Sequence, residues 1–120
     1  IHKGLRDKLE LGNLDSYRDW GHSKDYVRAM HKIINFETPD EWIISTGETW
    51  SVRDLVEYVF RKLDMDWQEY VVQNPKFMRP EELKYLKGDS QRSRDVLNWE
   101  PEYTFHTMLD EMIEEWMKKL

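Results

Sequence analysis

The sequence predicts a single α/β domain in which about four to five helices accompany a few short strands. Apolar residues recur at helical spacing in several stretches, and short β-rich runs lie between them. The chain has 120 residues, enough for one domain with a core of its own. No internal repeat, low-complexity tract or linker divides it, so residues 1–120 are treated as one unit.

The N-terminal part is expected to alternate between helix and strand. Residues 1–9 are interpreted as the tail of a helix, and residues 9–14 as a short strand. Residues 23–36 have helical spacing, with Ser23 as the N-cap. The run Glu-Trp-Ile-Ile-Ser-Thr at residues 41–46 ends at a glycine and predicts a strand.

The C-terminal part is expected to be mostly helical. Residues 51–63 open with Ser-Val-Arg-Asp, a capping-box pattern, and continue with apolar residues on one face. A strand is predicted at residues 70–72, and a helix at residues 80–86 because a proline stands at its first position. A short helix is then predicted at residues 90–97. A longer helix with a clear apolar stripe is predicted at residues 104–120.

Composition excludes several classes of function. Hydrophobic residues make up 39% and charged residues 35%, the balance of a soluble globular domain. The net charge is −6 and the cations are interspersed with acids, so we expect no nucleic-acid partner. The absence of Cys excludes disulfides. The sequence contains no run of about 18 apolar residues, the length that a membrane-spanning helix needs. Because the first residue is Ile1, we expect the chain to start inside a longer protein or after a removed piece.

The segment Arg-Pro-Glu-Glu at residues 79–82 is a candidate anion site. Arg79 stands just before the predicted helix start, where its guanidinium would add to the positive end of the helix dipole. Glu82 lies about one turn further on, and its carboxylate could accept two hydrogen bonds from a vicinal diol. Together they would read a nucleotide diphosphate and its ribose. The alternative is an ordinary acidic first turn with no ligand.

Arg18 is the second candidate, because it stands between a predicted strand and a predicted helix. An arginine at such a junction can point at a ligand, helped by the main-chain amides of the helix start. In the alternative interpretation Arg18 only pairs with Asp15 or Asp19, and Trp20 belongs to the core.

No catalytic, cofactor or metal site is predicted. Tyr58 and Lys62 have the Tyr-x-x-x-Lys spacing of an acid/base pair in which the lysine lowers the tyrosine pKa. Such a pair needs a dinucleotide cradle, and the glycines form no Gly-x-Gly-x-x-Gly motif, so we interpret the spacing as coincidental. The four histidines show no metal-ligand spacing.

A resemblance to a known family rests on several blocks of sequence. Residues 11–27, LGNLDSYRDWGHSKDYV, are similar to a segment of GDP-mannose 4,6-dehydratases and depart from it only at Ser16, Tyr17 and Ser23. Residues 44–53, ISTGETWSVR, resemble a second family block in which Trp50 replaces a histidine. The blocks FMRPEE, KGD and LNWEP follow in the family's order.

The resemblance implies a C-terminal substrate-binding domain of an extended short-chain dehydrogenase. In that family NADP oxidises C4 of GDP-mannose, water leaves across C5 and C6, and hydride returns to C6. The cofactor and the catalytic residues belong to an N-terminal Rossmann domain, which we expect to be absent here, leaving the chain inactive alone. GDP-mannose, the missing Rossmann domain and further copies of the chain are the expected partners, and the cytoplasm the expected location. An exposed patch rich in Trp or Met is also expected, where the partner domain would pack.

The family's binding residues map onto Arg18 and Arg79 for the diphosphate and onto Glu82 for the ribose. Two departures lie beside them, since Lys84 stands where the family has Asp and Tyr17 where it has Lys. Two alternatives remain open at this point. The chain could belong to another GDP-sugar reductase or epimerase, or it could be a standalone acidic interaction domain.

Overall fold

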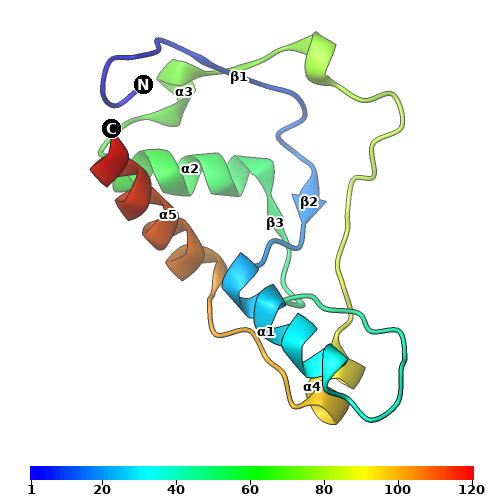
Figure 1. The fold of residues 1–120 in the computed structure, drawn as a ribbon. Coiled ribbons are helices and arrows are strands. Elements are labelled where there is room, and N and C mark those ends of the chain that lie inside the picture. Colours follow the sequence, from blue (N-terminus) through cyan, green and yellow to red (C-terminus); the bar gives the residue numbers. More distant parts are fainter.

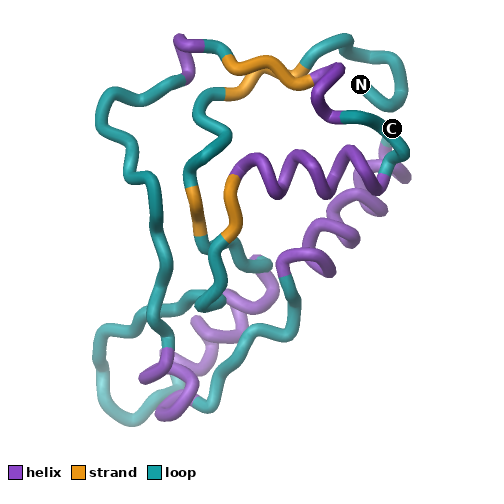
Figure 2. The backbone as a smooth tube through the Cα atoms, turned by 180° about the vertical axis from the view of Figure 1, so that it is seen from behind, coloured by secondary structure: helices purple, strands orange, loops and turns teal.

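The computed structural model describes all residues 1–120 as a flat assembly with extents of 52 × 37 × 18 Å (Figure 1). Five α-helices, one short 3-10 helix and four short strands are joined by long loops (Figure 2). The α/β class and the number of helices predicted from the sequence are confirmed. The two termini lie close together beside the end of the last helix (Figure 1). No helix has the length and the apolar character needed to span a membrane.

The strands form two separate pairs. Strand β1 (Leu9–Leu11) runs parallel to β4 (Val71–Gln73), which confirms strands predicted at both places. Strand β2 (Tyr17–Arg18) runs antiparallel to β3 (Trp50–Ser51), with Arg18 opposite Trp50. The second pair joins Arg18 to the residue two positions before α2.

Helices α1 (Ser23–Ile34) and α2 (Val52–Lys62) begin close to the predicted positions. The N-cap of α1 is His22 and not Ser23, because the imidazole Nδ1 accepts a hydrogen bond of 3.0 Å from the Lys24 amide. The predicted capping box of α2 is confirmed. The Asp54 amide donates to the Ser51 hydroxyl at 3.0 Å, and the Ser51 amide donates to the Asp54 carboxylate at 2.9 Å.

The remaining helices are α3 (Trp67–Tyr70), the 3-10 helix η1 (Pro75–Phe77), α4 (Gln91–Leu97) and α5 (Phe105–Lys119). Helices α4 and α5 were predicted, whereas α3 and η1 were not. Two small buried clusters hold the chain together. One contains Ala29, Leu97 and Trp99, and the other contains Phe105, Met108 and Leu109.

The prediction of a helix at residues 80–86 was wrong. The main-chain groups of this stretch pair with Tyr17 instead, because the Tyr17 amide donates to the Lys84 carbonyl at 2.8 Å and the Leu86 amide donates to the Tyr17 carbonyl at 3.1 Å. Tyr17 and Tyr85 form an isolated parallel bridge. Pairing with β2 therefore satisfies polar groups that a helix would have used.

Two further predictions were wrong. Residues 1–9 are not a helix, because the Gly4 amide donates to the Ile1 carbonyl in a turn where Gly4 has φ of 73°. Residues 41–46 are not a strand, because no other segment pairs with them. The hydroxyls of Ser90 and Ser93, at the start of α4, donate instead to the carbonyls of Ser45 and Ile43 at 2.9 and 2.7 Å.

Asp25 joins α1 to the loop before α5. Its buried carboxylate accepts hydrogen bonds from the amides of Glu102 and Tyr103 at 3.0 and 3.1 Å and from the Arg28 guanidinium at 2.9 Å. The Trp99 indole donates to its carbonyl at 2.9 Å. Burial alone would raise the pKa of Asp25, but these donors outweigh burial and hold the pKa below its usual value.

Candidate functional site

Three consecutive residues, Tyr17, Arg18 and Asp19, fasten the long loop between β4 and α4. Figure 2 shows this loop running along one edge of the molecule. Tyr17 binds it through the main chain at Lys84 and Leu86. Arg18 and Asp19 bind it through their side chains. The loop carries Arg79 and Glu82, so the structure places all three predicted site residues on β2 and on the segment fastened to it.

Arg18 lies directly beside Glu82. Its Nη1 donates hydrogen bonds of 2.7 Å to the carbonyls of Tyr17 and Leu83, and its Nη2 lies 3.5 Å from Oε1 of Glu82. The alternative partners expected from the sequence are engaged elsewhere, since Asp15 pairs with Arg53 at 3.0 Å. The structure thus brings together two of the predicted residues from distant parts of the chain.

Asp19 is a connecting residue that the sequence analysis did not select. Its Oδ1 accepts a hydrogen bond from the Thr46 amide at 3.0 Å, and its Oδ2 accepts from the amides of Gly47 and Gly88 at 2.9 and 3.3 Å. Gly88 permits this approach, because a Cβ there would lie 2.3 Å from the Cβ of Ser45. An acidic residue directly after Arg18 was the available signal in the sequence.

Arg79 is exposed and forms none of the ion pairs or hydrogen bonds of the structure. The expected helix dipole does not act on it, because no helix begins at Pro80. Arg79 stands three residues before Glu82, in the part of the loop that precedes the contacts with β2. The structure therefore leaves Arg79 free to reach a ligand but does not bring it onto Arg18 or Glu82.

A polar cavity of about 540 Å³ adjoins the residues that Asp19 holds. No hydrophobic residue lines it; its walls are Thr46, Gly47, Glu48, Lys87, Gly88, Asp89, Ser90, Gln91 and Arg94. Arg94 donates to the Thr46 carbonyl at 2.8 Å and to the Ser90 hydroxyl at 3.3 Å, so its charge is directed inward onto the protein. The lining contains two cationic side chains and two carboxylates, so the cavity carries no net charge. They are Lys87, Arg94, Glu48 and Asp89.

The Tyr58 and Lys62 side chains both meet Asp110. The Tyr58 hydroxyl donates to Oδ1 of Asp110 at 2.6 Å, and the Lys62 ammonium lies 3.4 Å from the same oxygen. Burial and the Asp110 carboxylate raise the pKa of Tyr58, so the hydroxyl is held protonated. An activated tyrosine would need the opposite shift.

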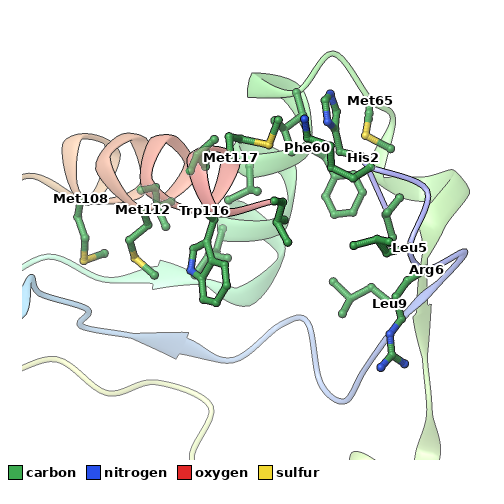
Figure 3. A pocket seen from close by; sticks show the side chains of 18 of the residues that line it. His2, Leu5, Arg6, Leu9, Phe60, Met65, Met108, Met112, Trp116 and Met117 are labelled. Carbon is green, nitrogen blue, oxygen red and sulfur yellow. The ribbon is translucent and has the colours of Figure 1, made fainter.

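An apolar groove of about 790 Å³ opens between α2, α5 and the N-terminal residues (Figure 3). Sixteen of its 21 lining residues are hydrophobic, and they include Met65, Met108, Met112, Trp116 and Met117. Trp116 is 58% exposed, a large value for so apolar a side chain. The expected exposed patch rich in Trp and Met is therefore present.

Sequence comparison gives one consistent family. A family model described as GDP-mannose 4,6 dehydratase matches residues 1–112. The GDP-mannose 4,6 dehydratase of Drosophila melanogaster is 40% identical over 93% of this chain and 32% of its own length. The human protein of the same name is 35% identical over 94% of this chain and 35% of its own length. The chain thus spans about a third of the length of the curated relatives it matches.

Solved structures share the fold at lower sequence identity. RMD from Pseudomonas aeruginosa, complexed with NADPH, has a TM-score of 0.86 and 24% identity, covering 99% of this chain and 39% of that one. UDP-glucose 4-epimerase from Thermotoga maritima with UDP-glucose has a TM-score of 0.82 and 21% identity, covering 93% and 35%. At these identities the likeness concerns the fold alone. A third similar structure is dTDP-glucose 4,6-dehydratase from Bacillus anthracis, with a TM-score of 0.79 and 20% identity. The match covers 93% of this chain and 35% of that one.

Proposed function

The chain belongs to the GDP-mannose 4,6-dehydratase family, and on that basis we propose that it is the substrate-binding part of an enzyme converting GDP-mannose to GDP-4-keto-6-deoxymannose. The observation that carries this proposal is the contact between Arg18 and Glu82. The motif match assigned these residues to adjacent parts of one nucleotide, and they are neighbours in space although far apart in sequence.

Each side chain has capacity for its part of the ligand. The two protons of Arg18 Nη1 go to main-chain carbonyls, so Nη2 and Nε remain for two parallel hydrogen bonds to a diphosphate. The Glu82 carboxylate accepts hydrogen bonds from the two ribose hydroxyls. Arg79, on the exposed part of the same loop, adds a second cation to the diphosphate.

The role of these contacts in catalysis is positioning. A nucleotide held at Arg18 and Glu82 fixes the attached sugar, so that its C4 can meet a hydride acceptor supplied by the rest of the enzyme. Binding energy from a part of the substrate that does not react can accelerate the reaction in this way.

The residues of this chain do not fit the NADP cofactor of the family. Its glycines stand at residues 4, 12, 21, 47 and 88, and no glycine-rich loop precedes a helix. We therefore assign the cofactor and the acid/base residues to a Rossmann domain in the remaining two-thirds of a full-length enzyme. No chemical step is assigned to the chain itself.

The test is a chimera in which this chain replaces the matching third of the Drosophila melanogaster relative. The relative itself is the positive control, and the chimera with Arg18→Ala is the matched negative control. We expect the chimera to convert GDP-mannose to the 4-keto-6-deoxy product, measured by chromatography. A folded chimera that binds NADPH but leaves GDP-mannose unchanged would overturn the proposed function. Saturable micromolar binding of NADPH to the isolated chain would contradict the assignment of the cofactor.

A further inference from the structure

The apolar groove between α2, α5 and the N-terminal residues shares no residue with the candidate nucleotide site. None of Arg18, Arg79 and Glu82 lines it. Phe60 and Leu109 do line it and are only 7% and 4% exposed, so part of its wall belongs to the buried core. Its volume of about 790 Å³ falls within the range of sites that enclose small organic ligands.

The charged side chains that line the groove all have the same sign. They are Lys3, Arg6 and Lys8, and no Asp or Glu lines it, although the chain as a whole has a net charge of −6. The Lys8 ammonium donates a hydrogen bond to the Glu69 carbonyl. The exposed side chains of Lys3 and Arg6 take part in none of the ion pairs or hydrogen bonds of the structure. The groove therefore offers two free cations beside an apolar surface.

The polar and the apolar lining residues lie at different ends of the groove. Figure 3 shows His2 and Arg6 at the end formed by the N-terminal residues, whereas Met108 and Met112 lie at the other end, along α5. Trp116 lies between the two ends and is 58% exposed. A ligand with an anionic head and a long apolar tail would place its head near residues 2–8 and its tail along α5.

Main-chain contacts hold the cationic end in place. The Gly4 amide donates to the Ile1 carbonyl at 2.8 Å, which closes a turn around Lys3. Leu9, at the start of β1, pairs with Val71 of β4. The cations between these two points therefore need little rearrangement to meet a ligand, and such preorganisation lowers the cost of binding.

The charges of the lining favour an anionic amphiphile over a cationic or neutral one. Any long apolar tail gains about 25 cal/mol for each Å² of apolar surface that it buries. An anionic head would pair with Lys3 and Arg6 in addition, whereas a cationic head would be repelled by them. The net charge of the whole chain acts in the opposite direction, so a preference for the anion would have to come from the groove itself.

We propose that this groove is a binding site for a long-chain carboxylate, with the tail on α2 and α5 and the head group paired with Lys3 and Arg6. The inference is independent of the proposed function, because none of its residues belongs to the nucleotide site. A second copy of the chain and the rest of a full-length enzyme are the competing occupants, and the test separates them.

The test is calorimetric titration of the 120-residue chain with decanoate and with decyltrimethylammonium, each below the concentration at which it forms micelles. These ligands have similar tails and opposite charges, and the chain is expected to bind decanoate about three- to tenfold more tightly. The double variant Lys3→Gln/Arg6→Gln is expected to lose this preference. Lys32→Gln/Lys76→Gln, which removes two cations that do not line the groove, is the matched control and should keep it. Met112→Gln should weaken the binding of both ligands.

Equal affinities of the wild type for the two amphiphiles would overturn the inference, as would an unchanged preference in the Lys3→Gln/Arg6→Gln variant. Sedimentation velocity tests the second copy as occupant, because bound decanoate is expected to reduce self-association of the chain. A chain that self-associates but binds no decanoate would assign the groove to that second copy. A folded chimera with the Drosophila melanogaster relative should still bind decanoate. Loss of binding in the chimera would assign the groove to a contact with the rest of the enzyme and would also overturn the inference.

Discussion

Asp19 accepts a hydrogen bond of 3.3 Å from the Gly88 amide while its carboxylate also holds the Thr46 and Gly47 amides. One side chain thus connects the end of the loop between β4 and α4 to residues 46 and 47, which precede β3. Arg18 is the adjacent residue, so the geometry of the candidate site depends on this connection.

Replacing Asp19 by Asn is expected to reduce the free energy of unfolding by about 1–3 kcal/mol, because an amide cannot accept all of these hydrogen bonds. Urea denaturation measures the change. Asp15→Asn is the control, since Asp15 is exposed and forms only a surface pair with Arg53, and its effect should stay below about 1 kcal/mol. Equal effects of the two changes would show that Asp19 does not hold the loop.

Asp25 is expected to make the stability fall in acid. Its pKa is lowered in the folded chain, so its stabilising contribution is complete above the ordinary aspartate value of 3.8 and is lost as pH falls through the lower folded value. Denaturation midpoints measured below pH 5 should show a steeper loss for the wild type than for Asp25→Asn. Parallel pH profiles would contradict this assignment.

Arg79 is expected to bind the diphosphate although the helix predicted beside it is missing. Arg79→Ala should weaken GDP binding by about ten- to a hundredfold, the value of a charge-assisted hydrogen bond. Arg79→Lys should recover part of the affinity, because it keeps the charge but not the fork. Unchanged calorimetric affinity in a folded Arg79→Ala variant would make Arg79 an ordinary surface residue.

The apolar groove is expected to cause self-association of the isolated chain. Large exposed apolar surfaces drive association, and Trp116 and Met112 are 58% and 49% exposed at the groove. Sedimentation velocity should show concentration-dependent species, reduced in a Trp116→Gln variant. Val27→Gln, a change of an equally exposed apolar residue on α1, is the control. A strict monomer at high concentration would contradict the expectation.

Features determined by nearby residues could be predicted from the sequence. The capping box of α2 depends on Ser51 and Asp54, which are three residues apart, and it forms as expected. The stripe of α5 packs Phe105, Met108 and Leu109 into a buried cluster, as its spacing predicted. In both cases the determining contacts lie within one or two helical turns.

Features determined by distant partners could not be predicted in this way. The Pro80 segment has the local signals of a helix, but Tyr17 competes for its main-chain groups. The contact between Arg18 and Glu82 depends on the same pairing, so spacing alone gave no indication of it. Family resemblance named both residues, and only the fold shows that they meet.

The most direct test of the account is to map GDP-mannose onto the ¹⁵N-labelled chain by NMR. The largest shifts of amide signals are expected at residues 17–19 and 79–88, and they should disappear in a folded Arg18→Ala variant. Shifts confined to the apolar groove or to the surface of Tyr58 and Lys62, or no shifts at all in the wild type, would contradict a nucleotide site at Arg18 and Glu82.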